Sequence, residues 1–403
     1  MMTLAAAPYP VLRRSAMATG LVFALSGLVQ ASWVSRLPEV RTRLHADPGS
    51  LGLALLGIAV GSILATPMTG RLVRRFGSRT VVAASCGLST LALVGASLVQ
   101  SVVELGLVLF VFGVGYGSWD VAMNIHGHGV EASAGKAWMP RYHAAWSVGS
   151  FLGAGLGALA VAIGVPVAAH FSVASAGVFA AVLGLLMLFL ADDDATSGSE
   201  LDDAATAARQ EQRAGRLFSL SLLLLGVVLG CSTLIEGAAS DWLAIYFDDV
   251  RHVTPAAGAA AFTTFAVAMA ASRGAGTWTI NWLGRAGAVR ASSAVALVGV
   301  GMLLLSPVVA LAYVGAALWG LGTAIVFPAV ISAAGDTPGR SAEAISMVAP
   351  IGYSGFLLGP PLIGLLARSI GIGHALWVVG GLAAIMVAFA GATRERQRDE
   401  AMP

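Results

Sequence analysis

Carboxylates and an amide interrupt one of the most apolar stretches of the sequence. Asp120 and Asn124 lie within the apolar run 104–128, and Glu131 follows it closely. On a helix turning about 100° per residue, these three side chains share a face that spans about 60°. An acid in hydrocarbon costs at least about 2.5–3.5 kcal/mol, so such a face usually meets an aqueous cavity or a polar partner. We therefore expect Asp120 and Glu131 to exchange protons and Asn124 to contact a solute. The alternatives are a structural hydrogen-bond cluster between helices and, for Glu131, a solvated loop position.

The following apolar run begins with residues that could relay protons or contact a solute. His143 and Trp146 open the run 140–163. Histidine titrates near neutral pH, so His143 is a candidate proton relay, although a hydrogen bond to a carbonyl at the membrane edge explains it equally well. Trp146 is a candidate for contact with solute. His126 and His128 are expected at the membrane interface.

Another acid, Glu236, lies in the apolar run 217–239. We expect Glu236 towards the outer face and in a coupling role, followed by a loosened helix end rich in small residues. Trp242 and Tyr246 are expected in the aromatic belt where a membrane meets water. Arg273 is expected to extend its long side chain to the interface.

The composition excludes a soluble protein. Of the 403 residues, 57% are hydrophobic and 11% are charged, and too little polar surface remains to face water. The formal charge of +2 and the scattered basic residues indicate no nucleic-acid partner. No HExxH, GxSxG, Walker A loop or Cys/His metal cluster occurs. We therefore expect no enzyme activity, no metal and no cofactor, and an ion gradient as the energy source for any uphill transport.

Hydrophobic runs of about 20 residues, each long enough to cross a bilayer core of about 30 Å, recur along the chain. We predict an all-α membrane protein of twelve transmembrane helices, in two pseudo-symmetric six-helix halves. The predicted helices are 16–35, 50–70, 80–99, 104–128, 140–163, 168–191, 217–239, 256–276, 289–308, 310–333, 343–367 and 372–391. Residues 1–191 form the first half, 192–216 a polar cytoplasmic linker, and 217–403 the second half with a short tail.

The distribution of basic residues predicts the orientation. Of the 23 Lys and Arg residues, 18 fall on the side of the N-terminus and 5 on the other side. Because cytoplasmic loops carry the excess of Lys and Arg, both termini are expected in the cytoplasm, with the chain in a bacterial inner membrane.

An internal repeat supports two parallel halves. Phe112-Gly-Val-Gly115 resembles Trp319-Gly-Leu-Gly322 at an offset of 207 residues. The same offset carries Trp146-Ser147 onto Tyr353-Ser354 in the next predicted helix.

The loop between the second and third helices resembles the major facilitator loop signature G-x-L-x-D-R-x-G-R-R. Its matching and basic positions are Gly70, Arg71, Arg74, Arg75, Gly77 and Arg79. The chain departs from the signature at Arg74, which replaces the aspartate, and at Ser78, which replaces a basic residue. In the family that aspartate helps to latch the cytoplasmic gate, and Arg74 lacks the carboxylate that this latch uses. Arg75 and Arg79 are expected to pair with acids or helix C-termini. Gly284-Arg285-Ala-Gly287 resembles a second, altered copy.

Four further stretches resemble the bacterial YbjJ-like inner-membrane branch of the major facilitator superfamily, which is distantly similar to fucose-permease-type sugar porters. They are Ser35-Arg-Leu-Pro-Glu39, Asp120 with Asn124 and Glu131, Glu236 with Asp241-Trp242, and Gly352–Pro361. The resemblance implies a transporter of a small solute, working as a monomer in the lipid bilayer. It adds Arg36, Asp241 and Tyr353 to the residues expected to line a substrate cavity.

Three functions compete at this point. The leading one is proton-coupled symport of a sugar-like or other small polar metabolite by alternating access. The second is proton-coupled export of drugs or amphiphilic compounds. It is weakened because Leu109 stands where the drug antiporters of the family usually have arginine, and because Gly153 is followed by Ala154 instead of proline. The third is a membrane sensor or scaffold without transport.

Overall fold

The computed structural model describes residues 8–134, 138–190, 220–336 and 341–394. The side chains at 132, 140, 341–343, 345, 346, 349, 350 and 353 are not described within these ranges. The predicted linker 192–216 lies outside the described residues, as does the tail beyond 394. Throughout the described part, the regular elements are helices and no strand occurs.

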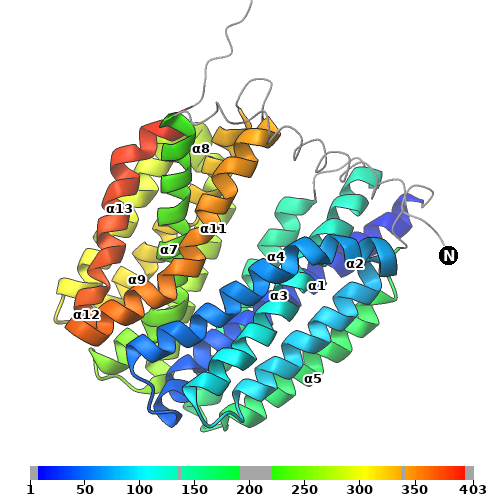
Figure 1. Ribbon diagram of the computed structural model, residues 1–403. Coiled ribbons are helices and arrows are strands. Elements are labelled where there is room, and N and C mark those ends of the chain that lie inside the picture. The colour runs from blue at the N-terminus through cyan, green and yellow to red at the C-terminus, as the bar shows by residue number, and fades with distance from the viewer. Residues whose placement is uncertain (1–7, 135–137, 191–219, 337–340, 395–403) are drawn as a thin grey trace, which may run out of the picture. The chain divides into compact units, whose positions relative to one another are not determined.

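Where the connections lie within the described residues, they are short, as between α1 and α2 or between α4 and α5 (Figure 1). The helices are α1 (Tyr9–Arg43), α2 (Pro48–Ala96), α3 (Val102–Ala134), α4 (Met139–Ala162), α5 (Val167–Leu186), α7 (Leu220–Asp249), α8 (Pro255–Leu305), α9 (Val309–Thr323), α10 (Val326–Gly335), α11 (Ser341–Ile370), α12 (Ile372–Ala375) and α13 (Trp377–Phe389), with a final 3-10 turn at Ala390–Thr393.

Two of these helices are pairs of membrane segments joined by a tight turn. Within α2 the backbone turns at Gly77, where φ is 78°, and within α8 it turns at Gly284, where φ is 69°. Only glycine adopts such a positive φ readily. The described residues contain nine helical spans long and apolar enough to cross a membrane, plus the shorter apolar stretch Ser354–Ile370 in α11. Dividing α2 and α8 at their glycines gives the twelve predicted crossings. Some helices, such as α1, are longer than predicted, while α5 is shorter.

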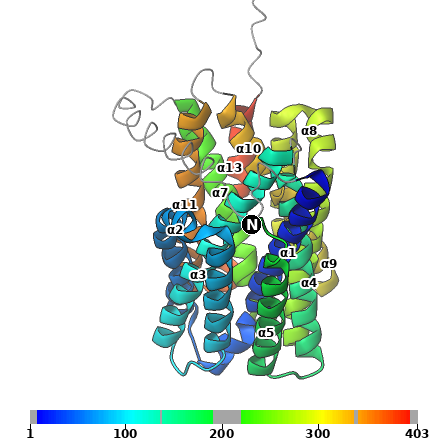
Figure 2. The ribbon, with the colours of Figure 1, turned by 90° about the vertical axis from the view of Figure 1, so that its right-hand side faces the viewer.

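The helices gather into two compact units that do not follow the sequence halves. One unit contains α1 to α5 together with residues 240–266 and 360–375, and the other contains residues 220–239, 267–359 and 376–394 among those described. In the first unit α2 packs mainly on α3, while α1 packs on α4 and α5 (Figure 2). The helices α7, α8 and α11 each contribute to both units.

The repeat at offset 207 corresponds to the same packing contact in each unit. A Cβ at Gly115 would collide with Ser89 and with the carbonyl oxygen of Ser85. A Cβ at Gly322, 207 residues later, would collide with Ala296 and the carbonyl oxygen of Ser292, which are also 207 residues later. The two positive-φ turns, Gly77 and Gly284, have the same separation.

The middle of α7 differs from the sequence expectation. The helix continues without a break from Leu220 to Asp249, so the loosened end expected after Glu236 is wrong. Trp242 and Tyr246 are fully buried, which corrects their expected place in an aromatic belt. Burial of these large rings explains the difference: Trp242 packs at Gly364 of α11, where a missing side chain leaves room for the indole.

Glycines also allow α1 and α4 to approach closely. A Cβ at Gly149 of α4 would overlap the carbonyl oxygen of Ala24 in α1, and one at Gly153 would overlap Leu28. Gly155, on another face of α4, has open space around its Cβ position.

We predict that Gly149→Ala lowers the melting temperature of the detergent-purified protein, because overpacking typically costs about 1–3 kcal/mol. The matched control is Gly155→Ala in the same helix, where nothing lies within 4 Å. Alanine is favoured over glycine in a helix by about 1 kcal/mol, so the control should keep or raise the melting temperature. Equal melting temperatures for the two variants would contradict the close α1–α4 contact.

Candidate functional site

The polar face of α3 carries an accessible acid. The side chain of Asp120 is exposed, although Trp119 next to it is fully buried. The Asn124 amide nitrogen, one turn further along, donates to the Asp120 carboxylate at 3.2 Å and to its backbone carbonyl at 2.8 Å. The predicted pairing of Asp120 with Asn124 on one helix face is therefore present.

One turn before Asp120, a phenol joins three helices of the first unit. The Tyr116 hydroxyl donates to the amide oxygen of Gln30 on α1 at 2.9 Å and accepts from the indole nitrogen of Trp146 on α4 at 3.0 Å. Tyr116 also stacks on Phe112, with ring centroids 5.6 Å apart. Gln30, Tyr116 and Trp146 are all half-buried, so each retains accessible surface.

Of this network, the sequence interpretation identified Trp146 and missed Gln30 and Tyr116. Gln30 could have been noticed as a polar residue within an apolar run. Its partner Tyr116 could not be predicted, because it lies 86 residues away on another helix. Together, the aromatic rings, the amides and the carboxylate can bind a small molecule with hydroxyl groups. The rings cover its apolar faces, and the amide and acid groups fix its hydroxyls.

A separate hollow of about 560 Å³ lies between α1, α4 and α5. Its lining includes Leu25, Leu152 and Leu185 and is almost entirely apolar. It has no polar group suited to orient a hydrophilic solute, so it is distinct from the network around Tyr116.

Other predicted proton carriers of the first unit have different surroundings. The Glu131 carboxylate accepts from the backbone amides of Trp138 and Met139, at 2.6 Å for Met139, where α4 begins. A carboxylate is favourable at a helix N-terminus, so Glu131 caps the start of α4. His143 is exposed, with its ring edge against Phe23. His126, expected at an interface, is instead fully buried and stacked on Phe189.

Of the three residues added by the family resemblance, Arg36 and Asp241 have described side chains. Arg36 is completely buried, where it pairs with Glu39 and donates to the carbonyl oxygen of Val165 at 2.6 Å. Asp241 is half-buried on α7. Tyr353 lies on α11, and its side chain is outside the described residues.

Glu236 forms an ion pair in the second unit. Arg273 of α8 donates from Nη2 to Glu236 Oε1 at 3.1 Å. The expectation that Arg273 reaches the interface is therefore wrong, because a carboxylate within the helix bundle holds its guanidinium.

The turn at Gly77 exposes Arg71, Arg74 and Arg75. Arg79 donates to the carbonyl oxygen of Phe189, just after the end of α5. This contact matches the expectation that Arg79 meets a helix C-terminus, where unpaired carbonyls attract a cation.

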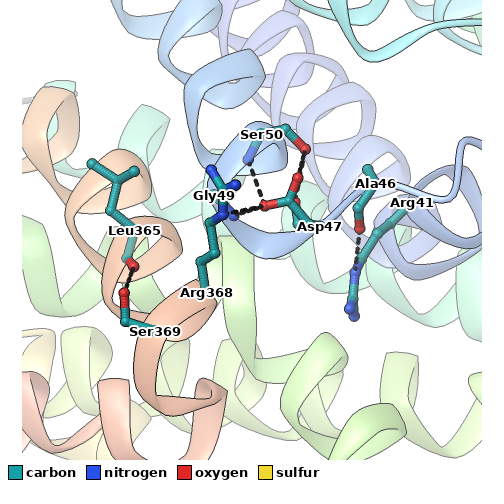
Figure 3. Close-up of polar contacts among 8 residues, drawn as sticks. All are labelled: Arg41, Ala46, Asp47, Gly49, Ser50, Leu365, Arg368 and Ser369. Atoms are coloured by element: carbon teal, nitrogen blue, oxygen red, sulfur yellow. Dashed lines mark hydrogen bonds and ion pairs between the residues drawn. The ribbon is translucent and has the colours of Figure 1, made fainter.

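At the N-terminal end of α2, polar contacts connect the helix to α11 (Figure 3). Asp47 caps α2 by accepting from the backbone amides of Gly49 and Ser50, and Arg368 Nε lies 3.8 Å from its carboxylate. The hydrogen bond from the Ser50 hydroxyl is the main cause that lowers the pKa of Asp47. Close by, Arg41 pairs with Asp249 at the end of α7 at 2.6 Å.

Comparisons with known proteins agree with this architecture. Residues 15–356 match the model of the Major Facilitator Superfamily. The chain is 32% identical over 371 residues to the uncharacterized transporter y4wD of Sinorhizobium fredii, covering 91% of this chain and 95% of that one. It is 31% identical over 355 residues to an uncharacterized MFS-type transporter of Yersinia pestis, covering 87% and 88% respectively.

Solved structures share the fold at low sequence identity. A bacterial homologue of the lysosomal transporter Spinster, in an inward-facing conformation, superposes with a TM-score of 0.76 at 14% identity, covering 97% of this chain and 100% of that one. The D-xylose-proton symporter superposes at 0.73 with 15% identity, covering 95% and 97%. The Escherichia coli fucose:proton symporter superposes at 0.62 with 16% identity, covering 94% and 98%. The chain is a multi-pass membrane transporter of the major facilitator superfamily.

Proposed function

We propose that this transporter moves a small polar, sugar-like solute across the membrane by proton-coupled symport. The observation that carries the proposal is the accessible carboxylate of Asp120 next to the Gln30–Tyr116–Trp146 network. An acid inside a membrane helix is costly unless it has a function or a partner, and proton carriage is a common function for such an acid. The network supplies the rings and hydrogen-bonding groups that a hydroxylated solute needs.

The comparisons support the same class of solute by analogy. The fold is shared with symporters of D-xylose and fucose, although the identities of 15% and 16% carry fold information alone. The Tyr116 hydroxyl bonds the Gln30 amide and the Trp146 indole, and these polar groups favour a polar solute over the amphiphilic compounds that a drug exporter would bind.

The proposed cycle is alternating access powered by the proton gradient. Protonation neutralises Asp120, which lowers the cost of excluding water from the site when the loaded transporter changes conformation. The transporter works as a monomer in a bacterial inner membrane, with both termini in the cytoplasm. The excess of basic residues on that side supports this orientation.

We expect Asp120→Asn to abolish solute-driven proton uptake, because the amide cannot carry a proton yet keeps the shape of the acid. The measurement is acidification inside proteoliposomes that contain a pH-sensitive dye, across a panel of sugars, sugar acids, amino acids and amphiphiles. Glu104→Gln is the matched control, since Glu104 lies on the same helix and is exposed near its start. Solute-dependent acidification that persists in Asp120→Asn would overturn the coupling role. Equilibration of a labelled panel member without any proton signal in the parent would overturn proton symport.

We expect Tyr116→Phe to raise KM for the transported solute about three- to tenfold, because the network loses hydrogen bonds worth about 0.5–1.5 kcal/mol each. Tyr142→Phe is the control, since the Tyr142 hydroxyl is buried and has no hydrogen-bond partner within the described part of the chain. Uptake of the labelled solute, measured over a range of concentrations, checks both variants. An unchanged KM in Tyr116→Phe would exclude the network from solute binding.

A further inference from the structure

The ion pair between α7 and α8 lies deep in the membrane-spanning part of the second unit. Arg273 precedes the turn at Gly284 by 11 residues, or about 16 Å of helix. Glu236 precedes the end of α7 at Asp249 by 13 residues, or about 20 Å. These distances are more than half the thickness of a hydrocarbon core of about 30 Å, so both residues belong to the membrane-spanning part of their helices.

Arg273 is the more exposed member of this pair. The Arg273 side chain retains 29% of its accessible surface and Glu236 retains 14%. Around them on α7, Ile235, Ala238 and Ala239 are completely buried. A half-buried guanidinium in the membrane-spanning part of a helix is stable only where water or a polar ligand reaches it. A solute arriving there meets positive charge first.

A second ion pair on α8 provides the contrast. Arg285 pairs with Asp336 at 2.7 Å, and there the arginine is the covered member at 10% while the aspartate retains 42%. That pair ties the turn after Gly284 to the end of α10, and its shorter distance and covered cation suit a structural role. In the Arg273–Glu236 pair the arginine is instead the more exposed member, which suits a cation that exchanges partners.

The chemistry of the guanidinium defines the ligand. Arginine presents five N–H donors in a planar fork that matches a carboxylate, and such charge-assisted bonds are about twice as strong as neutral ones. An exposed aromatic ring lies nearby: Phe356 of α11 packs beside Gly237, the residue after Glu236. The ring can cover an apolar part of a bound molecule while the arginine holds its acid group.

We infer that Arg273 is a binding residue for the carboxylate of the transported solute, and that Glu236 is the counter-ion that occupies the guanidinium when the site is empty. The inference rests on the proposed function and narrows its solute to an organic acid, such as a sugar acid. Glu236 pairs with Arg273 while no solute is bound, so the empty site stays charge-balanced within the membrane. The carboxylate of the solute then competes with Glu236 for the guanidinium.

The test compares matched acids and neutral molecules. Binding of glucuronate and glucose, galacturonate and galactose, and gluconate and sorbitol is measured by titration calorimetry on the detergent-purified full chain. We expect at least one acid to bind at least tenfold more tightly than its neutral counterpart. Equal binding within every pair, tighter binding of the neutral members, or no binding of any acid would overturn the inference.

Four variants assign the preference to Arg273. The double variant Arg273→Gln with Glu236→Gln keeps the site neutral, so it should fold and lose the acid preference completely. Arg273→Lys keeps the charge without the fork and should lie between the parent and the double variant. Glu236→Gln removes the competing carboxylate and should bind the acid several-fold more tightly. Arg290→Gln, an exposed arginine on the same helix, should leave the preference unchanged.

Persistence of the acid preference in the folded double variant would overturn the role of Arg273. These outcomes are separate from a failure of proton symport. Acid binding without solute-driven acidification would retain the Arg273 site and overturn the coupling. Acidification driven by neutral sugars alone would retain the coupling and overturn the Arg273 site.

Discussion

A polar group within a hydrocarbon layer needs a partner or water, and this constraint accounts for most of the arrangement described above. The backbone meets it by remaining helical, which pairs its amides and carbonyls internally. Side-chain hydroxyls in the helices meet it by bonding back to carbonyls one turn earlier, as Thr19 does to Ser15 and Thr90 does to Cys86. Some polar groups find their partner on another helix, as Tyr116 does with Gln30 and Arg273 does with Glu236, and the proposed solute contacts lie at these groups.

Close helix packing is the second consequence of the same constraint. Lipid tails are as apolar as leucine, so helices gain little from burying apolar side chains against each other and depend on tight contact instead. The glycines of α3 and α4 provide it: Gly113 faces the backbone of Ile58, and Gly149 faces that of Ala24. The Gly149 contact holds α1 and α4 close together, so that Gln30 and Trp146 both reach Tyr116 of α3.

The sequence predicted those features that depend on local periodicity. Long apolar runs predicted the helices, and one offset of 207 residues predicted a repeat, in which Gly115 and Gly322 make related contacts. The alignment of Asp120 with Asn124 followed from the turn of a single helix. Partners from different helices could not be predicted this way. Gln30 and Arg273 acquired their significance only when Tyr116 and Glu236 were placed beside them, and the burial of Trp242 depends on the glycine opposite it in α11.

The two units expose charges of opposite sign within their helices, and this difference bears on how such a transporter can be driven. In the first unit the accessible group is the acid Asp120, whose neighbours are an amide and a phenol and which can gain a proton. In the second the more accessible member of the ion pair is Arg273, which is balanced by Glu236. A carboxylic acid can carry a proton through a transport cycle, whereas a guanidinium acts as a fixed cation. Under the function proposed above, this difference assigns the response to the ion gradient to the first unit and the selection of solute charge to the second.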